Sequence, residues 1–294
     1  MKKVLLSALM VLTSVCVNAQ KALVVIAHGA PSNAWNAPVL ALENQVKDEL
    51  KARGINDFDY VRVALMEFSE PSMSTVFADC EKQGVKQVFA LPLFITSSSH
   101  SEQDVPNILG LKFNPNTVKD LKEEGAKFVD TDMKVTVGPT LSYGDVIPEI
   151  IAERVKEMSK DAKNETFVIL AHGDADYLPM WNDLLKRAAE KTEEATGIKF
   201  GGSQLIGMGN FIYTDAEATL IKAGKDKKRV LAQGIYLQSG LKGMADFAAK
   251  ADDQKEVIKK LPKGTEYVFG AKGLLPDGRI SKWIVDRAAE WIKK

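Results

Sequence analysis

The stretches LVVIAHGAPSNAWN (residues 23–36) and FVILAHGDADYLPMWN (residues 167–182) are two copies of one pattern. Each copy starts with an apolar run typical of a β-strand, continues with Ala-His-Gly, and leads past a Trp-Asn pair into a helical pattern. Such a repeat predicts a chain of two similar α/β halves, with a histidine at the end of the first strand of each. The copies contain His28 and His172, two of the three histidines in the chain.

The rest of each half repeats the same order of strand-like and helical patterns. Apolar runs separated by amphipathic helical patterns cover residues 21–29, 59–68, 85–96 and 134–139, and then 166–173, 200–211, 227–237 and 266–271. Continuous Val, Ile and Leu runs of this kind are typical of parallel strands buried on both faces. The predicted fold class is α/β. We expect two doubly wound parallel-sheet domains, residues 21–160 and 161–294, related by internal duplication and with an active cleft between them.

Aligning the two halves shows which polar side chains each one carries at its strand ends. The third strands align without a gap, Val88 on Val230, and this alignment places His100 on Lys242. In the second strands, ALMEFSEPSM aligned on GMGNFIYTDA places Glu67 opposite Asn210. The first half therefore presents two histidines and a glutamate where the second half presents His172, Asn210 and Lys242.

His28, Glu67 and His100 each follow one of the first three predicted strands. In an open parallel sheet, ligands bind outside the carboxyl ends of the strands, so these three side chains are expected to converge. Two imidazoles and a carboxylate suit a divalent ion such as Co²⁺, Fe²⁺, Ni²⁺ or Zn²⁺. Taken singly, each histidine also fits a capping or loop residue, and Glu67 fits a solvated side chain. Their shared position at strand ends favours a metal site.

Three segments of the first half carry a resemblance to a known family: AHGAPSNAWN, ALMEFSEPSM and LPLFITSSSHSEQDVP. They resemble the signature segments of the class II tetrapyrrole chelatases, specifically the sirohydrochlorin cobaltochelatases of anaerobic cobalamin synthesis. The likeness extends to VTVGPTLSYGDVIPEIIAERV. It implies a chelatase that inserts a divalent ion, Co²⁺ before Fe²⁺ or Ni²⁺, into a tetrapyrrole without an organic cofactor. It also implies that His28, Glu67 and His100 bind the metal and take up the pyrrole protons.

The same resemblance implies a flat macrocycle held between the two domains. Apolar and small residues are expected to contact its face, namely Phe94, Ser97, Ser98 and Ser99, and Ser32, Asn33 and Lys242 are expected to donate to its acidic side arms. Trp35 is interpreted as packing at the start of a helix, because Trp181 repeats it. Two departures from the family pattern are Ala30, where many relatives have serine, and a serine run before His100 in place of glycines.

The first twenty residues, MKKVLLSALMVLTSVCVNAQ, have the pattern of a secretory signal peptide, with cleavage before Gln20. A membrane anchor is disfavoured because Ser7, Thr13 and Ser14 interrupt the apolar run. A lipoprotein signal at Cys16 is disfavoured because Val15 is bulkier than the usual small residue. The sequence thus predicts a periplasmic protein, which then has one cysteine, Cys80, too few for an internal disulfide.

An exported location leaves two other functions open. The first is a periplasmic haem- or metal-binding protein of a haem acquisition system, or one that removes the iron, with His28 and His100 as ligands. The second is a solute-binding protein of two α/β lobes, which predicts a cleft without converging ligands. Nucleic acid is not an expected partner, because the chain has 39 basic and 39 acidic residues and no large field of one sign.

Overall fold

The structure is a computed structural model that describes residues 20–294. The signal peptide expected at residues 1–20 lies outside the described residues except for Gln20. Within residues 20–294, no helix combines the length and the apolar character that crossing a bilayer requires.

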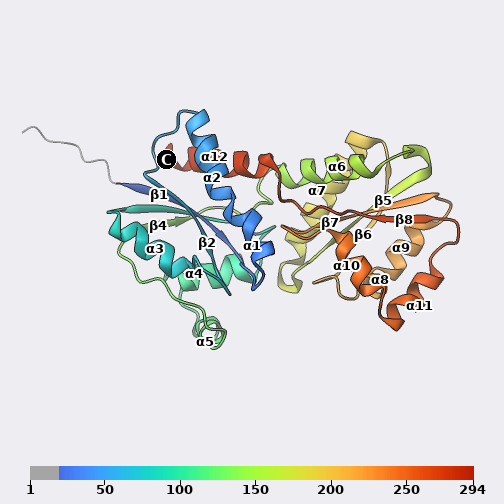
Figure 1. Ribbon diagram of the computed structural model, residues 1–294, viewed down its shortest axis with the longest axis horizontal. Helices are drawn as coiled ribbons and strands as arrows, with labels where there is room; N and C mark the ends of the chain where they lie inside the picture. The colour runs from blue at the N-terminus through green and yellow to red at the C-terminus, as the bar shows by residue number, and fades with distance from the viewer. Residues whose placement is uncertain (1–19) are drawn as a thin grey trace, which may run out of the picture.

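Two sheets of four parallel strands form the centres of two lobes (Figure 1). The first sheet has the order β2-β1-β3-β4 and contains β1 (Lys21–Ala27), β2 (Tyr60–Leu65), β3 (Gln87–Pro92) and β4 (Lys134–Val137). The second has the equivalent order β6-β5-β7-β8 and contains β5 (Glu165–Ala171), β6 (Lys199–Leu205), β7 (Arg229–Ile235) and β8 (Glu266–Phe269). The predicted α/β fold with two similar doubly wound sheets is confirmed.

Helices cover both faces of each sheet, which is why the central strands are continuous apolar runs. Every residue of β5 is buried, and so is every residue of β1 after Lys21. The helices of the first half are α1 (Asn33–Leu40), α2 (Leu42–Ala52), α3 (Met73–Lys82), the π-helix η1 (His100–Asp104), α4 (Val105–Ile108), α5 (Pro115–Glu123) and α6 (Val146–Met158). Those of the second half are the 3₁₀-helices η2 (Ala162–Asn164) and η3 (Ala175–Tyr177), α7 (Leu178–Thr196), α8 (Ile212–Asp215), α9 (Glu217–Gly224), α10 (Leu241–Ala248), α11 (Asp252–Lys260) and α12 (Gly278–Ile292).

The strand registers confirm one of the two alignments between the halves and correct the other. Val88 pairs with Ala22 and Val230 with Thr166, which are equivalent positions, so the third strands align as expected. In the second strands, however, Leu65 pairs with Ala27 and Leu205 with Ala171. Glu67, two residues beyond its strand, therefore matches Gly207 and not Asn210.

The error in the second alignment has a physical cause. The sequence alignment relied on residue identities in the loops after the strands, whereas register is fixed by backbone pairing along the strands. Two equivalent hydrogen bonds fix it here: Glu67 N–H donates to the His28 carbonyl and Gly207 N–H to the His172 carbonyl, both at 2.9 Å. The register between β5 and β6 also shifts at Phe167/Val168, an irregularity that the sequence pattern does not reveal.

The last helix of each half packs on the other half. α6 lies along α7 and against β7, whereas α12 lies along α2 and against β3, as Figure 1 shows for the red helix beside the blue one. The Trp291 ring stacks on Phe89 of β3 and on Phe58, with centroids 5.4 and 5.9 Å apart. Arg154 of α6 forms a buried ion pair with Asp277 at 3.2 Å. A single apolar cluster consequently runs through both halves and fixes their arrangement.

The chain boundary at residues 160/161 separates the two sheets, since β4 ends at Val137 and β5 begins at Glu165. As a boundary between domains it stays a prediction. The exchange of α6 and α12 means that neither half, cut at this point, keeps all the helices that cover its own sheet.

Candidate metal centre

His28 follows β1 directly, and its neighbour Gly29 lets the chain turn beside β2. Gly29 has φ +89°, and a Cβ there would lie 2.3 Å from the Glu67 carbonyl oxygen, so only glycine allows this approach. The His28 Nδ1 lies 2.8 Å from the Gly29 carbonyl oxygen, which can only accept a hydrogen bond. Nδ1 therefore carries the proton, and Nε2 keeps the lone pair that a metal ion requires.

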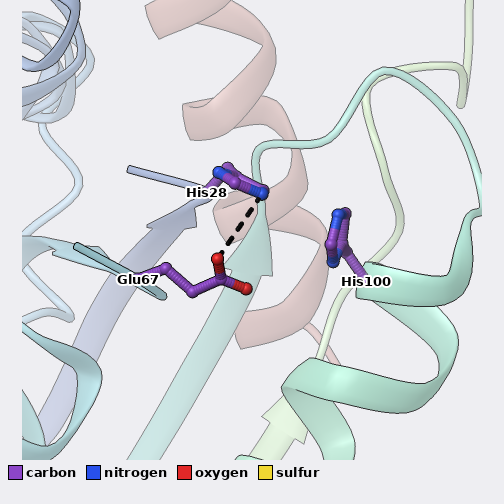
Figure 2. A group of neighbouring side chains, drawn as sticks. All are labelled: His28, Glu67 and His100. Carbon is purple, nitrogen blue, oxygen red and sulfur yellow. Dashed lines mark ion pairs between the residues drawn. The ribbon is translucent and has the colours of Figure 1, made fainter. Parts of the chain in front are cut away.

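Glu67 follows β2 and directs its carboxylate toward His28 (Figure 2). The distance from Glu67 Oε2 to His28 Nε2 is 3.9 Å, and the glutamate side chain is only 13% exposed. A carboxylate this well buried beside an imidazole is a group positioned by the fold, and the interpretation of Glu67 as a solvated rim side chain loses its support.

His100 begins η1, and the helix itself orients the ring. His100 Nδ1 lies 2.7 Å from Asp104 Oδ2, one turn along, which leaves Nε2 available to a metal. Burial alone would lower the pKa of His100, but the hydrogen bond to Asp104 and the negative charges of Asp104, Glu67 and Asp174 together raise it above its ordinary value. Asp104 thus favours both the orientation and the protonated form of this ring.

The three side chains converge as the sequence predicts. One ligand atom from each of His28, Glu67 and His100 lies within 4.8 Å of the other two (Figure 2). The two imidazole rings meet edge to face, with centroids 4.7 Å apart and an interplanar angle of 75°. Ligands of one tetrahedral ion at about 2.1 Å are about 3.4 Å from each other, so a small movement of the side chains closes the site around an ion. Two nitrogens and one oxygen leave further coordination positions open.

The four residues expected to contact the face of a macrocycle differ in their surroundings. Phe94 is buried and its ring stacks on the His100 ring, with centroids 5.9 Å apart, so Phe94 packs against a metal-ligand candidate. Ser97 lines a pocket between the two halves. Ser98 N–H donates a hydrogen bond to the Ser101 hydroxyl oxygen, and Ser99 donates two hydrogen bonds to Asp174 of the second half. Their role toward a substrate stays a prediction.

The three residues expected to donate to the acidic side arms of a macrocycle are not part of the triad. Ser32 and Asn33 are exposed at the start of α1. Lys242 is the second residue of α10, which follows β7, and its ammonium group pairs with Asp246 at 2.6 Å. Trp35 packs against the core, as its interpretation at the start of a helix predicts.

The second half does not repeat the triad. His172 bonds to the Gly173 carbonyl at 2.7 Å, as His28 does to Gly29, but the side chain is exposed. Gly207 stands in the place of Glu67, so no carboxylate faces His172 from this position. Lys242, which the sequence alignment places opposite His100, has no lone pair to donate while it is charged.

The sequence reasoning missed Asp174, which the second half contributes to the same region. Asp174 Oδ2 accepts hydrogen bonds from the N–H and the hydroxyl of Ser99, both at 3.0 Å. Burial alone would raise the pKa of Asp174, but the hydrogen bonds from Ser99 and from the Asp176 N–H lower it. The signal was present in the repeat, where AHGA of the first copy reads AHGD in the second.

A pocket of about 700 Å³ lies between the halves, next to the segment that carries His100. The first half contributes Ser97, Ser101 and Thr140, and the second contributes Pro179, Met180 and Arg187. The Asp174–Ser99 contact joins the end of β5 to the loop after β3, so the carboxyl edges of the two sheets face each other here. This arrangement agrees with the expected cleft between the domains.

Cys80 takes no part in this region. Its thiol is buried in α3, and burial raises its pKa to about 12, so it stays protonated near neutral pH.

Residues 22–158 match the model of the CbiX family. A sirohydrochlorin cobaltochelatase of Methanococcus maripaludis is 35% identical over 91 residues, which make up 31% of this chain and 59% of that protein. The chain therefore spans less than two thirds of this relative's length. A sirohydrochlorin cobaltochelatase of Methanococcoides burtonii is 32% identical over 102 residues, 34% of this chain and 72% of that protein.

The fold has a solved counterpart in the sirohydrochlorin chelatase SirB from Bacillus subtilis subspecies spizizenii, in complex with cobalt. The two structures agree with a TM-score of 0.60 over 92% of this chain and 94% of that chain, at 13% identity. At this identity the likeness shows the fold alone. The sequence matches go further, and the family model covers residues 22–158, which include His28, Glu67 and His100. The chain belongs to the CbiX family, and the relatives that it matches are sirohydrochlorin cobaltochelatases.

Proposed function

We propose that this protein is a metal chelatase that inserts a divalent ion into a tetrapyrrole such as sirohydrochlorin. Co²⁺ is the first choice of metal, before Fe²⁺ and Ni²⁺, because the relatives in Methanococcus and Methanococcoides are named for cobalt. The observation that carries the proposal is the convergence of His28, Glu67 and His100 within 4.8 Å beside a pocket between the halves.

The chemistry of insertion fits these groups. The ion must lose its protein ligands while the macrocycle loses two pyrrole protons, so each ligand that the ion leaves regains a lone pair. We expect Glu67 and one imidazole to take up these two protons as the ion passes to the macrocycle. The contact between His100 and Asp104 favours the imidazolium that this transfer forms, since the aspartate stabilises the added charge.

The pocket between the halves is large enough for a small-molecule ligand. Its volume of about 700 Å³ lies within the range of small-molecule sites, and it adjoins Ser97 and Ser101 near the His100 ligand. Serine hydroxyls and main-chain N–H groups there are suitable donors for carboxylate side arms. No organic cofactor is required, because the metal is itself the second substrate.

For location we propose export to the periplasm, supported by the charged start and apolar run of residues 1–20. N-terminal sequencing of the protein from a periplasmic extract tests this. A mature chain that begins at Gln20 or Lys21 is expected, whereas an intact Met1 in the cytoplasmic fraction would contradict it.

A metal-insertion assay tests the function. Purified protein is offered Co²⁺, Fe²⁺ and Ni²⁺ with sirohydrochlorin and, separately, with protoporphyrin, and the absorption spectrum of the macrocycle is followed over time. We expect Co²⁺ insertion into sirohydrochlorin above the rate without protein. No acceleration with any pair would overturn the proposal, and removal of iron from haem under the same conditions would favour the haem alternative.

A further inference from the structure

Phe68 combines two features that are costly in a folded protein. Its side chain is 63% exposed although it is large and apolar, and its backbone has φ +65°, in the left-handed region. A bulky side chain is rare in this region because its Cβ crowds the backbone. Strained residues of this kind persist where their surroundings hold them, and they cluster at functional sites.

The backbone around Phe68 is held at several points. Ser69 N–H donates to the Glu67 carbonyl at 2.8 Å, which closes a three-residue γ-turn with Phe68 at its centre. The Ser69 hydroxyl donates to the Ala30 carbonyl at 2.9 Å, and Glu67 N–H donates to the His28 carbonyl. The turn that directs Glu67 toward His28 therefore also fixes the direction of Phe68.

Packing does not explain the side chain. None of the three apolar core clusters of residues 20–294 contains Phe68. Its aromatic neighbour is His28, with ring centroids 5.8 Å apart and planes tilted by 36°. Phe68 thus extends the imidazole with an apolar surface at the rim of the triad.

The second half shows that the position keeps an apolar side chain even without a metal site. The register places Met208 where the first half has Phe68, and Met208 is 67% exposed. Gly207 and Gly209 flank it and take the positive φ values, +52° and +76°. The turn can therefore be built with glycines, and the first half instead keeps a strained phenylalanine next to its histidine.

We propose that Phe68 is a substrate-contact residue, whose ring stacks against the face of the tetrapyrrole beside the triad. The inference deepens the proposed chelatase function and rests on it. A flat conjugated macrocycle has an apolar face and polar N–H groups at its centre. A phenyl ring next to His28 contacts such a face in an offset or tilted geometry while the central nitrogens face the metal ligands.

Binding of metal-free sirohydrochlorin tests the proposal, measured by quenching of macrocycle fluorescence. Phe68→Ala is expected to raise the Kd about three- to tenfold, the range that loss of one aromatic stacking contact gives, and Phe68→Leu to raise it less. Phe247→Ala is the matched control, because Phe247 of α10 is equally exposed, at 63%. The Kd of Phe247→Ala for the macrocycle is expected to equal that of the parent. Co²⁺ affinity without macrocycle is expected to be unchanged in all three variants.

Phe68→Gly separates substrate contact from a structural role. Glycine adopts a positive φ without crowding, so Phe68→Gly is expected to melt at a higher temperature than Phe68→Ala while binding the macrocycle equally weakly. A parent-like Kd in Phe68→Ala, or a loss of Co²⁺ affinity equal to the loss of macrocycle affinity, would overturn the proposal alone. If the parent protein binds no sirohydrochlorin, the proposed function fails, and this inference fails with it.

Discussion

Asp174 of the second half accepts two hydrogen bonds from Ser99 of the first, one from its N–H and one from its hydroxyl, both at 3.0 Å. Ser99 precedes His100, so this contact ties the segment that carries a metal ligand to the facing half. The geometry of the triad thus depends on both halves, although all three ligands belong to the first.

We expect Asp174→Ala to weaken Co²⁺ binding several-fold and to cost about 1 to 3 kcal/mol of stability, because the charged carboxylate loses two hydrogen bonds from Ser99 and one from the Asp176 N–H. Asp174→Asn keeps an acceptor oxygen and is expected to lose less. Asp176→Ala is the control, since the exposed Asp176 touches this contact only through its main-chain N–H. Calorimetric titration with Co²⁺ and thermal melting measure both effects, and an Asp174→Ala protein with parent affinity would contradict the role of this contact.

The raised pKa of His100 predicts how metal affinity depends on pH. Protons compete with the ion for the imidazole, so Co²⁺ affinity is expected to fall as pH drops through the raised pKa, from a higher pH than an ordinary imidazole near about 6.5 would give. In the metal-free protein, folding stability depends on pH in the opposite direction to Co²⁺ affinity. The raised pKa stabilises the fold fully below the unfolded-state value, and this contribution is lost as pH rises through the folded-state value.

Replacing Asp104 tests that assignment. Asp104→Asn removes the charge next to His100 Nδ1, so the midpoint of Co²⁺ binding is expected to move to lower pH. Titrations over about pH 5.5 to 8 cover the range in which histidine changes charge. Asp120→Asn on the exposed face of α5 serves as the control. A midpoint that stays in place, or that moves to higher pH, would show that Asp104 does not govern this ring.

The carboxylate of Glu67 is expected to contribute both charge and proton acceptance. Glu67→Gln keeps the size of the side chain but removes both properties, so we expect weaker Co²⁺ binding and a larger fall in turnover than in affinity. Glu124→Gln, an exposed glutamate that lines the small pocket beside Glu67, is the control. Equal losses of affinity and turnover in Glu67→Gln would leave Glu67 as a metal ligand without a role in proton transfer.

Trp291 tests the exchange of the last helices. It belongs to α12 of the second half but stacks on Phe89 and Phe58 of the first. We expect Trp291→Ala to reduce the free energy of unfolding by about 2 to 3 kcal/mol, at the low end for a tryptophan because the ring is partly exposed. Phe113→Ala, at a phenylalanine that is 79% exposed, is expected to change it little. Similar melting of both variants would mean that α12 adds little to the first half.

The repeat in the sequence was enough to predict the fold and the convergence of the triad. Hydrophobic runs define the parallel strands, and the carboxyl ends of such strands meet at one edge, so His28, Glu67 and His100 followed from position alone. The prediction that Asn210 is the counterpart of Glu67 was wrong, because backbone register identifies Gly207 as the counterpart and the sequence of the loops does not reveal it. Asp174 stands out in the repeat, where AHGA becomes AHGD, but its contact with Ser99 depends on how the two halves approach each other. The exchanged helices depend on the same tertiary relationship, which leaves no periodic pattern in the sequence.

The most direct test of the account compares three single variants in the Co²⁺ insertion assay with sirohydrochlorin. His28→Ala and His100→Ala are expected to lose insertion while remaining folded, because both side chains lie at the site and outside the apolar core. His172→Ala, the same substitution at the duplicated position, is expected to retain most of the activity, because Gly207 and Lys242 do not complete an equivalent site. Full activity in either first-half variant, or a loss in His172→Ala as large as theirs, would contradict the assignment of the metal centre to the first half.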